Sequence, residues 1–283
     1  IDGNLLGYPM WTNCKILIYR KDLIPEDQVP TTWDEYKAMA EKTATGDVYG
    51  TTVFGSGSDA VCSFLDFACQ AGAEGLVFDE EGNVNITDQA YVDALDFMVE
   101  MANADYSPTD SLATAATESQ ELFTNGKVAM QINWSHQYPA AVEALGADKV
   151  GCAPMIAGSA GIGATTGPWY QCIMKSSENK EMAQKYVEYM YDHNADYMDL
   201  TLKIAGRTSV YEEAGQEAGK EHTTAVLTTL ESAQSQPRPM VSTWAQIEEV
   251  LTGVVESCLG GADVNETLES AQAGIEAIGK EMV

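Results

Sequence analysis

Short, largely apolar runs recur through the first half of the chain, and their length is typical of buried strands. Glycine, proline and asparagine bound several of them, as expected where a strand ends in a turn. The runs that we predict to be strands are residues 4–9, 14–19, 49–54, 127–132 and 149–155. Because helical patterns separate most of these runs, we expect an α/β chain with its strands in an open sheet.

Apolar residues at helical spacing fill much of the remaining chain. One amphipathic stripe consists of Tyr91, Ala94, Leu95, Met98 and Val99. Thr32 and Glu35 have the spacing of a capping box, which predicts a helix start beside Trp33. The other predicted helices are residues 60–71, 118–123, 140–145, 177–190, 196–204, 223–233, 244–258 and 264–278.

The most informative stretch is residues 121–139. Asn125-Gly126 predicts a helix end, because both residues tolerate the left-handed backbone of a C-cap. The strand predicted over 127–132 is followed by Asn133, Trp134 and His136. Open α/β sheets bind small ligands beyond the carboxyl ends of their strands, and aromatic, amide and imidazole groups suit a sugar. Packing of the aromatic residues under a loop is the alternative.

A second polar segment, residues 55–59, follows the strand predicted over 49–54 and ends at Asp59. It is either an ordinary turn or a loop that binds ligand hydroxyl groups. A phosphate-binding loop is not supported, because the required glycine-lysine pattern is absent from the sequence.

The chain is strongly acidic, with 43 acidic against 15 basic residues and a formal net charge of -28 at pH 7. Nucleic-acid binding and adsorption to anionic membranes both require basic patches, so this balance opposes both. The six cysteines occur singly, without the CxxC pairs of zinc or redox sites. The sequence therefore predicts neither a metal nor a cofactor, and it leaves the disulfide state open.

Several segments, in order, resemble one protein family. They are the Tyr-Pro and Lys-Asp-Leu run of residues 8–23, the Pro-Thr-Thr-Trp-Asp-Glu start of 30–35, Phe-Thr-Asn-Gly-Lys-Val-Ala-Met at 123–130, the Gly-Pro-Trp turn and following segment of 167–177, and the terminal helix pair of 244–283. Together they resemble the extracellular sugar-binding proteins of ABC transporters, the maltose-binding-protein-like family. The resemblance covers essentially the whole chain and implies a two-lobed periplasmic-binding-protein-like fold of type II.

The sequence departs from this family in two ways. Members usually carry a long segment before the point that matches Ile1, so we expect an incomplete first lobe, made of residues 1–10 and 168–206. The second lobe is expected to comprise residues 11–167 and 207–283. After the strand over 127–132 this chain has Trp134-Ser135-His136 where maltose-binding protein has a Gly-Pro-Trp turn, so the resemblance does not specify the sugar.

The resemblance implies a non-enzymatic protein that closes its two lobes around a carbohydrate, expected to be an oligosaccharide, and delivers it to ABC transporter permease subunits. It implies a monomer outside the cell, either free in a periplasm or anchored to the surface as a lipoprotein. The expected ligand-binding residues are Trp11, Asn13, Asp59, Asn133, Trp134, His136, Trp169, Arg207 and Trp244.

Three other functions stay open from the sequence. A glycoside hydrolase needs two carboxylates about 5 to 10 Å apart across the cleft, whereas Asp59 is the acid within the aromatic strand-end segments. A binding protein for a non-sugar solute such as a polyamine should show clustered carboxylates in the cleft. A scaffold protein with this fold should lack an intact aromatic cleft.

Overall fold

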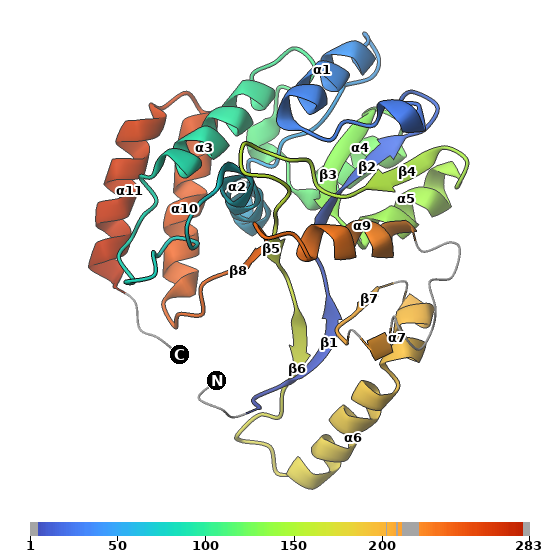
Figure 1. Ribbon diagram of the computed structural model, residues 1–283, viewed down its shortest axis with the longest axis vertical. Helices are drawn as coiled ribbons and strands as arrows, with labels where there is room; N and C mark the ends of the chain where they lie inside the picture. Colours follow the sequence, from blue (N-terminus) through green and yellow to red (C-terminus); the bar gives the residue numbers. More distant parts are fainter. Residues whose placement is uncertain (1–4, 202, 208, 211–220, 280–283) are drawn as a thin grey trace.

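The computed structural model describes residues 5–201, 203–207, 209–210 and 221–279, arranged as a larger and a smaller body (Figure 1). The larger body is built on an antiparallel sheet in the order β3-β2-β4. Its strands are β2 (Lys15–Arg20), β3 (Met130–Trp134) and β4 (Val150–Ala153). The central strand β2 places Leu17 opposite both Ile132 and Ala153, and all but its last residue are buried.

Helices cover this sheet and form the hydrophobic core with it. They are α1 (Trp33–Thr43), α2 (Gly57–Ala71), α3 (Gln89–Ala102), α4 (Ala116–Thr124), α5 (Gln137–Leu145), α9 (Glu221–Leu230), α10 (Trp244–Leu259) and α11 (Val264–Ile278). Short 3-10 helices occupy Glu26–Gln28 and Ser111–Ala113. Helix α2 is buried along almost its whole length because α3 and α10 pack against it (Figure 1).

The smaller body holds a second antiparallel sheet in the order β6-β1-β7. Its strands are β1 (Tyr8–Thr12), β6 (Trp169–Gln171) and β7 (Ile204–Ala205), and α6 (Lys180–Asp192) and α7 (Asn194–Thr201) lie against them. Strands β1 and β6 lead from this body to the larger one (Figure 1). Beside that passage, β5 (Thr165–Thr166) pairs in parallel with β8 (Gln236–Pro237).

Most predicted elements are present, with shifted ends. The first strand begins at Tyr8 rather than at residue 4, and the helix predicted over 196–204 ends at Thr201, before strand β7. Residues 50–54 are buried, and the backbone of the exposed Tyr49 bonds to residues 127 and 129, but the only bridge within 49–54 is at Tyr49, so the predicted strand is absent there. Residues 78–84 form a tight turn with a single bridge, between Phe78 and Val84.

Local signals explain where two helices begin and end. The Thr32 hydroxyl accepts a hydrogen bond from the Glu35 amide at 3.3 Å, as the capping-box spacing predicts. The Glu35 carboxylate, however, accepts from the amide of Thr31 at 2.8 Å rather than from that of Thr32. At the other end of the next helix, Gly72 has φ 95°, a left-handed conformation that glycine adopts without strain.

Among the described residues, no helix has both the length and the apolar composition that crossing a bilayer requires.

Candidate functional site

A cleft of about 470 Å³ opens where strands β1 and β6 meet the larger body. Its walls come from β1, the start of α2, the end of β3, the turn before β6 and the segment after β8. The lining residues are Trp11, Asn13, Ser58, Asp59, Cys62, Trp134, His136, Gly167, Pro168, Trp169 and Arg238. Segments far apart in the sequence therefore contribute to one binding-sized cavity.

Two of its aromatic residues are neighbours in the small sheet. Trp11 and Trp169 lie opposite each other in the pairing of β1 with β6, and their ring centroids are 5.2 Å apart with a 34° interplanar angle. Trp169 is 58% exposed, so one of the largest apolar side chains stands open to solvent at the cleft. The edge of His136 approaches Trp11, with 6.4 Å between ring centroids.

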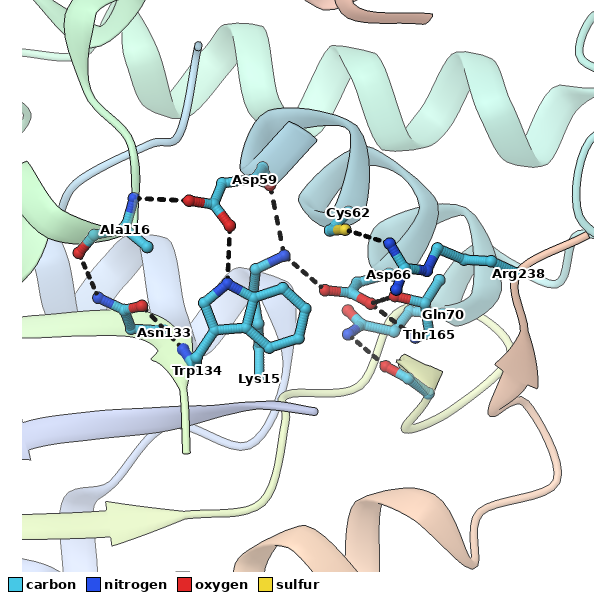
Figure 2. A network of polar contacts seen from close by, with 11 residues as sticks. Lys15, Asp59, Cys62, Asp66, Gln70, Ala116, Asn133, Trp134, Thr165 and Arg238 are labelled. Carbon is cyan, nitrogen blue, oxygen red and sulfur yellow. Dashed lines mark hydrogen bonds and ion pairs between the residues drawn. The ribbon is translucent and has the colours of Figure 1, made fainter. Parts of the chain in front are cut away.

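Trp134, at the end of β3, is held from two sides. Its indole Nε1 donates to the Asp59 carboxylate (Oδ1) at 2.7 Å. The Lys15 ammonium lies 4.7 Å from its ring centroid, within cation–π range. Figure 2 shows the ring beside the Lys15 side chain and below Asp59. This indole is therefore fixed before any ligand arrives.

Asp59 lies in the first turn of α2 and not in a loop, because the helix begins at Gly57. A carboxylate there is favourably placed near the positive end of the helix dipole. Its second oxygen accepts from the backbone amide of Ala116 at 3.2 Å. Both carboxylate oxygens thus accept a hydrogen bond from the protein, which fixes the orientation of the group (Figure 2).

A buried ion pair lies directly beneath this wall. Lys15 and Asp66 have side chains that are 0% and 1% exposed, and their Nζ–Oδ2 distance is 3.1 Å. The other Asp66 oxygen accepts from the amide and hydroxyl of Thr165 at 2.6 and 2.7 Å. Lys15 also donates to the Asp59 carbonyl at 3.4 Å. Because buried charges need such compensation, this network joins β2, α2 and β5 under the cleft (Figure 2).

Asn13 connects β1 to the loop after β3. Its amide Nδ2 donates to Nδ1 of His136 at 3.1 Å, and its Oδ1 accepts from the Ser135 hydroxyl at 2.6 Å. Since Nδ1 accepts this bond, the neutral imidazole carries its proton on Nε2. Desolvation by the surrounding protein lowers the pKa of His136, and the charge of Lys203 adds to this effect, while Asp59 opposes it. The imidazole is therefore held in its neutral form.

Six of the nine predicted ligand-binding residues line this cleft: Trp11, Asn13, Asp59, Trp134, His136 and Trp169. Asn133 does not, since it is fully buried behind Trp134 and its side chain bonds to the backbone of Ala116 and of Trp134. It acts by positioning its neighbours.

Trp244 and Arg207 also lie elsewhere. Trp244 begins α10, packs against the main core and donates to Glu248 at 3.3 Å. Arg207 lies 4.8 Å from the ring centroid of Tyr191 and donates to that residue's carbonyl, within the smaller body.

Five further residues line the cleft: Ser58, Cys62, Gly167, Pro168 and Arg238. Ser58 lies in the polar segment 55–59, whereas the other four were not predicted as ligand-binding residues. Arg238 lies between Pro237 and Pro239, a pattern typical of an extended linker rather than of a binding site. Cys62 faces the cleft because it lies one turn after Ser58 and Asp59 on α2, a spacing that could have identified it once the helix start was known. Burial raises the pKa of the Cys62 thiol.

Among the described residues, no group of three or more histidine, cysteine, aspartate or glutamate side chains is arranged to hold a metal ion. The chemistry of the cleft is instead that of aromatic faces, amide and imidazole groups, one carboxylate and one guanidinium.

Solved structures with this fold support a solute-binding assignment. A maltose-bound protein of T. maritima, MalE3, is 26% identical, has a TM-score of 0.87, and the match covers 99% of this chain and 74% of that one. The GacH receptor of Streptomyces glaucescens is 23% identical with a TM-score of 0.86, and the match covers 100% of this chain and 73% of the receptor chain. The predicted α/β, two-lobed periplasmic-binding-protein-like fold is confirmed.

Sequence relatives agree with the structural matches. A putative binding protein of Brucella abortus is 24% identical over 286 residues, covering 98% of this chain and 69% of the relative. A probable ABC transporter-binding protein of Deinococcus radiodurans is 26% identical over 203 residues, covering 67% of this chain and 48% of the relative. The model of the bacterial extracellular solute-binding protein family matches residues 4–196. This chain therefore belongs to the family of bacterial extracellular solute-binding proteins.

Proposed function

We propose that the cleft binds a carbohydrate, most simply an oligosaccharide, which the protein delivers to an ABC transporter. The observation that carries the proposal is the convergence of Trp11, Trp134 and Trp169 on one cavity. The C–H faces of a sugar ring are apolar and pack well on indole rings. Asn13 and His136 stand beside these rings and offer polar atoms to sugar hydroxyls.

The exposed Trp169 suits a site that closes. Burying this ring against a ligand removes apolar surface from water, which supplies free energy only in the ligand-bound arrangement. We propose that the two lobes follow the predicted division, residues 1–10 and 168–206 against residues 11–167 and 207–283, with the crossings shifted so that all of β1 and Arg207 belong to the first lobe. The ligand would then lie where β1 and β6 pass between them, a usual position for hinge closure.

The ligands of structural neighbours support a carbohydrate over other solutes. The T. maritima protein was solved with maltose and the GacH receptor with acarbose. Other neighbours were solved with cycloalternan, ribitol and D-mannitol. All of these ligands are rich in hydroxyl groups.

We further propose that the partners are the permease subunits of an ABC transporter, and that the protein acts as a monomer outside the cell, in a periplasm or anchored to the surface by a lipid. The Deinococcus radiodurans relative, a probable ABC transporter-binding protein, supports the transporter assignment.

We propose binding without catalysis. Glycoside hydrolysis requires a second carboxylate across the sugar from the first. Among the described lining residues the carboxylate is Asp59, and both its oxygens already accept hydrogen bonds from the protein. It is therefore poorly placed to act as a proton donor.

Isothermal titration calorimetry against maltose, maltotriose, mannitol and a polyamine tests the proposal. We expect saturable binding of at least one saccharide or polyol, and a loss of about tenfold or more in affinity for Trp169→Ala, because exposed aromatic anchors contribute strongly to binding. The matched control is Tyr186→Ala, since this residue is also 58% exposed but lies on α6, outside the lining of the cleft.

Binding of the polyamine alone would replace the carbohydrate assignment with a non-sugar solute. Equal losses for the Trp169 and Tyr186 variants would contradict the assignment of this cleft as the site.

A further inference from the structure

Arg238 is an unusual component of this cleft. It follows strand β8, is half-buried and lines the cavity beside Cys62. Its Nη1 donates to the Cys62 sulfur at 3.5 Å, a weak acceptor. Among the described residues no carboxylate lies within ion-pair distance of its guanidinium. Most of its five N–H donors are therefore available to a ligand.

The nearby carboxylates are already committed to other groups. Asp59 accepts from Trp134 and Ala116, and Asp66 pairs with Lys15 and accepts twice from Thr165. Figure 2 shows the Arg238 side chain extending from the segment after β8 toward Cys62. The protein thus supplies a guanidinium to the cleft without supplying the anion that would neutralise it.

A second cation stands beside the same cavity. The Lys203 ammonium lies 3.5 Å from the ring centroid of Trp11, and its charge contributes to the lowered pKa of His136. It is half-buried, and no ion pair joins it to another described residue. The other described lysines without an ion pair are exposed to solvent: Lys42, Lys127, Lys149, Lys175 and Lys180.

The balance of positive and negative charge at the cleft is the reverse of that over the whole chain. The chain carries 43 acidic and only 15 basic residues, so carboxylates are plentiful partners for any arginine. The charges of distant acids are largely screened beyond about 8 Å at physiological ionic strength. Close to the ligand, the charges of Arg238 and Lys203 outweigh the single, hydrogen-bonded Asp59.

We infer that the solute is a saccharide bearing an anionic group, which Arg238 binds while the indole rings hold the sugar. A guanidinium presents a planar fork of donors that matches two oxygens of a carboxylate or of a sulfate ester. Lys203 adds positive charge near Trp11. This inference rests on the proposed carbohydrate function and specifies the substrate class for the same cleft.

The test is calorimetric titration with two matched pairs of ligands: a digalacturonate with its neutral methyl ester, and a sulfated disaccharide with its unsulfated counterpart. At least one acidic saccharide should bind about tenfold to a hundredfold more tightly than its neutral counterpart, as expected for hydrogen bonds to a charged group. Its affinity should fall as ionic strength rises. Comparison of the carboxylate pair of ligands with the sulfate pair identifies which anionic group the cleft accepts.

Variants assign the effect to the guanidinium. Arg238→Gln should weaken binding of the acidic ligand far more than binding of the neutral one and so remove most of the preference, and Arg238→Lys should recover only part of it, because lysine lacks the fork. The control is Lys127→Gln, an exposed cation beyond the far end of β3 from Trp134. It should not alter either affinity.

Equal or tighter binding of the neutral saccharides, insensitive to Arg238→Gln, would overturn the inference and leave the proposed carbohydrate function standing. Absence of binding for every saccharide, acidic or neutral, would overturn both.

Discussion

The two aromatic walls of the cleft are held in different ways. Trp134 is fixed by a 2.7 Å hydrogen bond to Asp59 and by the Lys15 ammonium near its ring. Trp169 lies on a three-residue strand, is 58% exposed and contacts Trp11 rather than the main core. The Trp134 wall is therefore preorganised, whereas the Trp169 wall has most to gain from burial by a ligand. Substitutions at the Trp134 wall should therefore lower the unfolding free energy, whereas substitutions at the Trp169 wall should mainly lower the affinity for ligand.

The largest effect should come from breaking the ion pair beneath the Trp134 wall. Lys15→Met leaves the Asp66 charge buried without its partner, which costs about 3–5 kcal/mol of unfolding free energy. Urea denaturation followed by circular dichroism measures it. The exposed pair between Lys185 and Glu181 provides the control, and Lys185→Met should cost less than about 1 kcal/mol. Similar losses for the two variants would show that the buried pair does not support this wall.

A smaller effect should distinguish the two indoles directly. Trp134→Phe removes the donor to Asp59 and should lower the unfolding free energy by about 1–3 kcal/mol, as well as weakening ligand binding. Trp169→Phe removes no hydrogen bond in the described structure and should leave the unfolding free energy within about 0.5 kcal/mol of the parent chain. Comparable stability losses from both variants would remove the distinction between the walls.

The smallest expected effect is on pH dependence. The pKa of His136 is lowered in the folded chain, so the unfolded chain binds a proton first as pH falls below about 6.5. His136 should therefore make stability decrease as pH falls through that window. Protonation also places a hydrogen on Nδ1, which can then no longer accept from Asn13.

Urea unfolding at a series of pH values checks this prediction. His136→Gln should flatten the decrease in stability between pH 6.5 and the lower folded-state pKa. A slope unchanged by the substitution would contradict a lowered pKa at this position.

Sequence patterns predicted the elements well where the signal was local. The helix beginning after Thr32 and the left-handed Gly72 after α2 follow from capping chemistry alone. Residues 49–54 have a strand-like composition, but they pair with residues 127–130 at only one bridge. The extent of pairing between two distant segments cannot be predicted from the local sequence of either one.

The site was harder to predict because it is assembled from distant segments. The sequence alone does not distinguish the roles of Trp244 and Trp134. In the structure Trp244 begins a helix that packs against the core, whereas Trp134 ends a strand at the cleft. Arg238 was overlooked because its neighbours Pro237 and Pro239 suggested a simple linker, and only the packing of that segment beside α2 brings it to Cys62.

Fluorine NMR of the chain labelled with 5-fluorotryptophan tests the carbohydrate cleft most directly, since the five tryptophans give five separable signals. Single Trp→Phe variants assign them. Addition of a saturating saccharide should shift the signals of Trp11, Trp134 and Trp169, which line the cleft, and leave those of Trp33 and Trp244 in place. Shifts confined to Trp33 or Trp244, or no shift with any saccharide, would contradict the proposed site.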